Sequence, residues 1–154
     1  MADSSSTGKR IFQMAVPQLK CAVLELFDKG PMCIFHDVKD LTQVAANAVA
    51  YSLSNTGQVC CSIERVYMAK AIHEEFCQAV VEAMSKPWAY HVGNNGLDKG
   101  VMVGPLVSIM QHNHIHAHVQ DALDQGATLL YQGEILTEPL EHTSFFPVMV
   151  LANV

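Results

Sequence analysis

The chain has few of the features that would direct it to a nucleic acid or a membrane. Its 154 residues include 9 Lys and Arg against 15 Asp and Glu, which gives a net charge of −6, and the basic residues form no cluster. Binding of a polyanion needs a concentrated positive field, so we expect no nucleic-acid partner. No apolar run approaches the roughly 20 residues that cross a bilayer, so we expect no membrane partner.

The five cysteines lack the paired spacing of a disulfide framework and contain no Cys-x-x-Cys metal motif. An odd number of unpaired thiols is typical of a reducing compartment. Residues 1–10 also lack the apolar core of a secretory signal peptide. We therefore expect an intracellular, cytoplasmic protein without a structural metal site made of cysteines.

The composition is that of a folded domain, because 50% of the residues are hydrophobic and only 16% are charged. Short apolar runs alternate with stretches of helical spacing, which predicts an α/β fold with a mainly parallel open sheet and flanking helices. Helices are expected at 9–19, 40–53 (with Asp40 as N-cap), 72–84 and in a segment ending at Gly126. Strands or extended segments are expected at 21–26, 32–35, 62–68, 127–131 and 145–151, and a loop at 93–104.

Residues 53–67 form the stretch that most clearly suggests a catalytic residue. A turn at Asn55, Thr56 and Gly57 precedes Cys60 at the start of an apolar, β-branched run. A thiol near an element terminus can be activated as a thiolate, which would make Cys60 a nucleophile. Taken alone, the residues favour Cys60 and Cys61 as small buried hydrophobic residues at a strand start, which is what most cysteines in an intracellular domain are. The role of nucleophile is the alternative that the residues alone leave open.

Four histidines alternate with other residues at His112, His114, His116 and His118. On a helix they form two i, i+4 pairs on nearly opposite faces, so four imidazoles cannot converge on one metal ion. A strand would place all four on one face, but the segment continues into residues that end like a helix. We therefore expect a solvated histidine face, with no metal site beyond adventitious nickel or zinc binding.

Two motifs resemble those of the NAD(P)-dependent aldehyde dehydrogenases. Gly57-Gln58-Val59-Cys60 is similar to the Gly-Gln-x-Cys segment that carries the family's nucleophile, and residues 24–29 resemble its Leu-Glu-Leu-Gly-Gly-Lys segment. Gly104-Pro105 matches a further family segment, and the matches follow in the same order along the chain. The resemblance implies Cys60 as nucleophile, Glu25 as general base and Lys29 as the matching lysine. Taken alone, Glu25 reads as an outward-facing residue of an edge strand.

The resemblance also implies a division of the chain and a cofactor. It makes residues 1–23 the end of a cofactor domain, as a helix plus a strand, and residues 24–154 a catalytic domain, truncated at both ends. Ser4 falls on the serine of a Gly-Ser-Thr-x-x-Gly segment that approaches the phosphates of NAD or NADP. Asp3 stands in place of that segment's glycine, and an acid there opposes a phosphate.

Phe27 and Asp28 occupy the two glycine positions after Glu25. Glycines in such a turn allow a ligand to approach closely, so we expect both replacements to weaken binding of the nicotinamide end.

The function implied by the resemblance is oxidation of an aldehyde to a carboxylic acid with NAD(P), through a cysteine thioester. The family's second oxyanion donor, an upstream asparagine, and its later glutamate segment are not in this sequence, so we expect the isolated chain to be inactive. The alternative is a non-catalytic binding or structural subunit of a larger assembly, with a protein partner or oligomer covering its exposed surface. An incomplete chain is a third interpretation.

Overall fold

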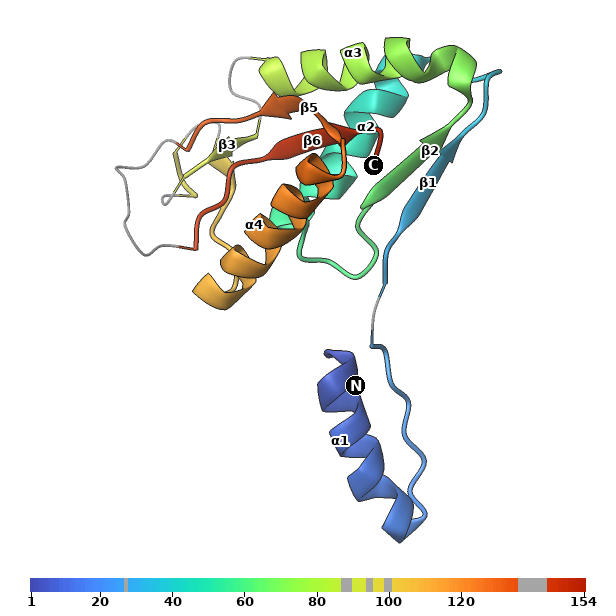
Figure 1. The fold of residues 1–154 in the computed structure, drawn as a ribbon, viewed down its shortest axis with the longest axis vertical. Helices are drawn as coiled ribbons and strands as arrows, with labels where there is room; N and C mark the ends of the chain where they lie inside the picture. Colours follow the sequence, from blue (N-terminus) through green and yellow to red (C-terminus); the bar gives the residue numbers. More distant parts are fainter. Residues whose placement is uncertain (27, 87–89, 94–95, 99–100, 136–143) are drawn as a thin grey trace.

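The computed structural model describes residues 1–26, 28–86, 90–93, 96–98, 101–135 and 144–154. Helices and strands alternate along the chain (Figure 1). The helices are α1 Ser5–Ala15, η1 Val16–Gln18, α2 Leu41–Leu53, η2 Ser54–Gly57, η3 Lys70–Ile72, α3 His73–Ser85 and α4 Ile109–Asp124. The strands are β1 Pro31–Ile34, β2 Arg65–Met68, β3 His91–Val92, β4 Val101–Val103, β5 Thr128–Gln132 and β6 Met149–Ala152.

The α/β class predicted from the sequence is confirmed, and most of the strand pairing is parallel. β1 pairs with β2 in parallel, in a register from Pro31–Arg65 to Ile34–Met68. β3 and β4 are also parallel, whereas β5 and β6 are antiparallel. Within the described residues the strands form three two-stranded sheets, so the open sheet is interrupted.

The core lies where α2 and α3 pack against each other and against the strands. Each helix buries one face, because its buried residues recur at intervals of three or four. The buried residues of the two helices are Ala45, Ala48, Val49, Phe76, Val80 and Met84. The strands contribute Ile34, Val92 and Val103, and Val148 before β6 completes the cluster.

Helix termini follow the capping signals in the sequence. Asp40 accepts a hydrogen bond from the Gln43 backbone N–H at 2.8 Å, which confirms it as the N-cap of α2. Ser108 caps α4 in the same way, accepting from Gln111 N–H at 3.1 Å. Gly126 has φ of +103° just after α4, a conformation that favours glycine.

Several predicted boundaries are wrong. The predicted loop at 93–104 contains β4, because Val103 is buried in the core and its strand pairs with β3. β2 begins at Arg65 rather than at residue 62, since residues 59–62 form a turn closed by the Ser62 N–H on the Val59 carbonyl. Helix α1 begins at Ser5 rather than at residue 9, because Ser4 provides a cap earlier than the apolar pattern indicates.

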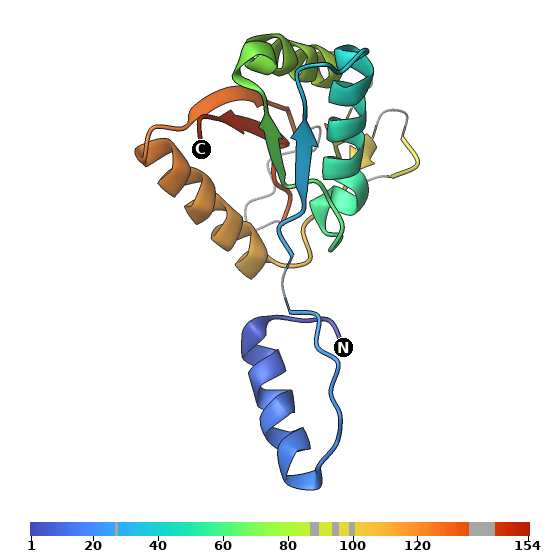
Figure 2. The same cartoon turned by 90° about the vertical axis from the view of Figure 1, so that its right-hand side faces the viewer.

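Residues 1–26 form a separate hairpin of helix and extended chain. After α1 and η1 the chain reverses at Leu19, which has a left-handed backbone with φ of 52°, and returns alongside the helix. The return is fixed by a bridge between Ala2 and Glu25 and by the packing of Gly8 against Leu26. In both views this hairpin projects away from the remaining elements (Figures 1 and 2).

Candidate functional site

Cys60 lies in an exposed turn between α2 and β2. Asn55, Thr56 and Gly57 all have left-handed backbones, with φ of 50°, 62° and 71°. They turn the chain out of α2 and into the segment that carries Cys60 and Cys61, which are both exposed. The interpretation of these cysteines as buried hydrophobic residues at a strand start is therefore wrong.

One side of the cysteine turn is held by residues 104–107. The Gly104 N–H donates to Thr56 Oγ1 at 3.1 Å, and the Val107 N–H donates to Gln58 Oε1 at 2.8 Å. Thr56 and Gln58 are positioning residues that the sequence reasoning did not identify. The signal was present, since Gln58 belongs to the Gly-Gln-x-Cys motif, but its partner 49 residues away was not predictable.

The other side of the turn is held by the segment that follows Glu25. The Gly30 carbonyl accepts from the backbone N–H groups of Glu64 and Arg65, at 3.0 and 3.2 Å. Arg65 Nη2 donates to the Lys29 carbonyl at 2.8 Å, and Lys29 Nζ forms an ion pair with Glu64 Oε2 at 2.7 Å. Ser62, inside this region, is buried, and its hydroxyl has no hydrogen-bond partner among the described residues.

Glu25 is exposed and lies in the hairpin of residues 1–26. Its backbone N–H donates to the Met1 carbonyl at 2.8 Å, and its own carbonyl accepts from Asp3 N–H at 3.1 Å. The turn between α2 and β2 lies at the end of the main body that faces this hairpin (Figure 2). Lys29 and Gly30, which follow Glu25 in the chain, contact Glu64 and Arg65, which follow Cys60. No hydrogen bond links the side chains of Glu25 and Cys60 within the described residues.

The N-terminus of α1 is the predicted contact for a dinucleotide phosphate. The Ser4 hydroxyl accepts from Thr7 N–H at 3.3 Å, and the Ser4 N–H donates to the Asp3 carboxylate. Hydrogen bonding from the Ser4 backbone lowers the pKa of Asp3, so this carboxylate is ionised at neutral pH. The negative charge of Asp3 at this helix terminus is unfavourable for a second anionic group beside it.

Phe27 and Asp28 occupy the two positions after Glu25 at which the family has glycine. Asp28 is exposed, and its Oδ1 accepts from the Lys29 backbone N–H at 2.7 Å. Phe27 lies outside the described residues.

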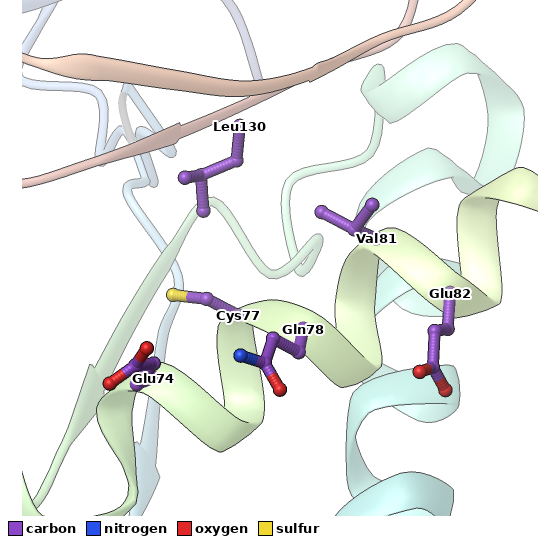
Figure 3. A pocket seen from close by; sticks show the side chains of 6 residues that line it. All are labelled: Glu74, Cys77, Gln78, Val81, Glu82 and Leu130. Carbon is purple, nitrogen blue, oxygen red and sulfur yellow. The ribbon is translucent and has the colours of Figure 1, made fainter.

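A shallow groove of about 420 Å³ lies between α3 and β5. Figure 3 shows Leu130 of β5 opposite Cys77 and Val81 of α3. Burial raises the pKa of the Cys77 thiol, which disfavours the thiolate that a nucleophile needs. The groove lining includes neither Cys60 nor Glu25, so it is separate from the predicted site.

Two other kinds of site are absent from the described residues. No group of three or more His, Cys, Asp or Glu side chains is arranged to hold a metal ion there. None of the helices in that part of the chain is long and apolar enough to span a membrane.

Known proteins resemble this chain along its full length. The aldehyde dehydrogenase family model matches residues 1–154. GabD of Escherichia coli, a succinate-semialdehyde dehydrogenase named for NADP(+), is 30% identical over 131 residues, which cover 85% of this chain and 26% of GabD. The mitochondrial succinate-semialdehyde dehydrogenase of Rattus norvegicus is 32% identical over 154 residues, covering 98% and 28% of the two chains.

The structural comparison leads to the same family. A 3,6-anhydro-L-galactose dehydrogenase matches with a TM-score of 0.86 and 31% identity, over 100% of this chain and 31% of that one. The chain spans less than a third of the length of these three relatives. Because the family model covers every residue and the fold agrees, the chain belongs to the aldehyde dehydrogenase family.

Proposed function

We propose that this chain carries the covalent part of aldehyde dehydrogenase chemistry, with Cys60 as nucleophile and Glu25 as general base. The observation that supports this most directly is the position of Cys60, exposed on a turn that is anchored on two sides. A nucleophile must be accessible and held in a fixed place, and this turn meets both requirements.

The chemistry needs few groups. The Cys60 thiolate adds to the carbonyl carbon of an aldehyde, and the carbonyl oxygen takes a proton to give a hemithioacetal. The Cys60 backbone N–H, which has no hydrogen-bond partner among the described residues, is available as one oxyanion donor. With an activated ester the thiolate displaces the alcohol and forms a thioester. Glu25 then accepts a proton from the water that hydrolyses it.

We propose that the isolated chain does not oxidise aldehydes with NAD or NADP. Asp3 places negative charge at the α1 N-terminus, where a phosphate would bind, and Asp28 places an acid where the family has glycine. Both effects are unfavourable for an anionic dinucleotide.

The division of the chain into residues 1–23 and 24–154 is a separate proposal. Limited proteolysis tests it, because two independent segments would be cleaved between them first.

A non-catalytic subunit is the second candidate. Residues 1–26 expose large apolar side chains, including Leu19 at 93%, Val23 at 75% and Met14 at 73%. Such a surface favours a protein partner or a second copy that covers it. A monodisperse monomer that binds no partner would count against this candidate.

The experiment that tests the first candidate compares the wild-type chain with Cys60→Ala and the matched control Cys61→Ala. We expect 4-nitrophenyl acetate hydrolysis that is lost in Cys60→Ala and retained in Cys61→Ala. Calorimetric titration of NAD and NADP should detect no binding at millimolar cofactor, and succinic semialdehyde should not be oxidised. Equal hydrolysis by both variants would refute the role of Cys60, whereas cofactor binding with Cys60-dependent oxidation would refute the proposed inactivity.

A further inference from the structure

Helix α4 contains two histidine pairs at i, i+4 spacing, and the structure distinguishes between them. The rings of His114 and His118 lie 4.1 Å apart between centroids, tilted by 55°, and both residues are exposed. His112 instead packs edge-on against Phe146 at 5.3 Å, and its Nδ1 lies 3.3 Å from Asn113 Oδ1. The His114/His118 pair is thus already assembled, whereas His112 is committed to other neighbours.

We propose that His114 and His118 form a two-imidazole site for a divalent late transition-metal ion, with water completing the coordination. Metal–nitrogen bonds of about 2.0–2.1 Å bring two ligating nitrogens within a few ångströms of each other, which suits rings in contact. Neutral imidazole favours nickel, copper and zinc over magnesium and calcium, and a site of nitrogen and water ligands suits Ni²⁺ or Cu²⁺. The proposed thiol chemistry makes no use of this site.

The surroundings favour a cation. Asp121 lies one turn after His118, and Asp124 ends the helix. Their side chains accept hydrogen bonds from the amides of Gln125 and Gln120 at 2.7 and 2.8 Å, and neither is in an ion pair with Lys or Arg within the described residues. Asp121 follows His118 by three residues, on the same side of the helix, and its negative charge raises the local concentration of cations.

Binding of the ion would act on the helix itself. None of the residues of α4 is buried, so tertiary packing holds this helix weakly. The facing arrangement of the two rings exists only while residues 114–118 are helical. An ion bound to both rings therefore stabilises the helical state relative to the unfolded chain.

The test is a titration of Ni²⁺ into the untagged chain and three variants, His114→Gln, His118→Gln and His116→Gln. His116 is the matched control, because it is exposed on the same helix and, among the described residues, the ring contact of the pair joins His114 and His118 without it. Glutamine is a good helix former, so the variants keep α4. All variants retain the same five cysteines, and differences between them therefore report on the histidines.

We expect the wild-type chain and His116→Gln to bind Ni²⁺ equally and to gain thermal stability from it. His114→Gln and His118→Gln should each bind at least about tenfold more weakly, because one anchor of a two-point attachment is lost. Absence of binding to the wild-type chain, or an equal loss in His116→Gln, would overturn the proposal. The same holds if His114→Gln bound Ni²⁺ as tightly as the wild-type chain.

Discussion

Replacement of Gly30 by alanine would test whether the segment after Glu25 holds the cysteine turn in place. A Cβ at this position would lie 2.2 Å from the Ser62 backbone oxygen, more than about 1 Å short of an ordinary contact. The oxygen cannot withdraw easily, because Glu64 and Arg65 both donate backbone hydrogen bonds to Gly30 itself. Overpacking of this kind costs about 1–3 kcal/mol, which corresponds to a fall in Tm of roughly 2–12 °C for a domain of this size.

The measurement is urea and thermal unfolding of Gly30→Ala beside Gly96→Ala. Gly96 is exposed, and a Cβ there would meet nothing within 4 Å, so this variant controls for the loss of glycine's freedom in the unfolded chain. Cys60 should also react with a thiol reagent at a changed rate in Gly30→Ala alone, because its turn must move. The reasoning fails if the two variants unfold at the same urea concentration and their thiols react alike.

Two further predictions concern α2 and α3. Asp40→Ala removes the side chain that accepts from Gln43 N–H and should lower the free energy of unfolding by about 1 kcal/mol. Asp37→Ala, the control, should change this free energy little. Equal effects of the two variants in urea unfolding would contradict the capping role of Asp40. Burial raises the pKa of Cys77, so at a given pH a smaller fraction of this thiol is thiolate than without burial. Its alkylation at pH 8 should therefore be slower than that of exposed Cys33, and it should accelerate as the pH rises. Peptide mass spectrometry after timed alkylation measures both rates, and faster labelling of Cys77 would contradict the prediction.

The helices of the main body were predictable because their signals are local. Asp40 stands three residues before the amide that it caps, and the apolar spacing of α2 and α3 fixes which face is buried. Strand β4 was missed because glycines surround its short apolar run, which resembles a loop until its pairing with β3 is known. The start of β2 was misplaced for a similar reason, since its first residue is set by hydrogen bonds to Gly30.

The candidate site shows the same division between local and distant information. The motif around Cys60 indicated a turn and a thiol, and the structure has both. The partners of Thr56 and Gln58 lie 48 and 49 residues away, and nothing in the local pattern specifies them. Likewise, the sequence makes the two histidine pairs of α4 equivalent, whereas in the structure His114 contacts His118 and His112 contacts Phe146.

The left-handed run from Asn55 to Gly57 has a consequence for when the thiol reaches its position during folding. A β-branched residue such as Thr56 is strained at φ of 62°, and such a conformation persists only where the surrounding structure imposes it. Here the Gly104 N–H, bound to the Thr56 hydroxyl, is part of that surrounding structure. A peptide containing only the turn would relax to another shape, and the nascent chain acquires it only after a long loop has closed. The backbone geometry that presents Cys60 is therefore a late product of folding, and an unfolded or partly made chain does not have it.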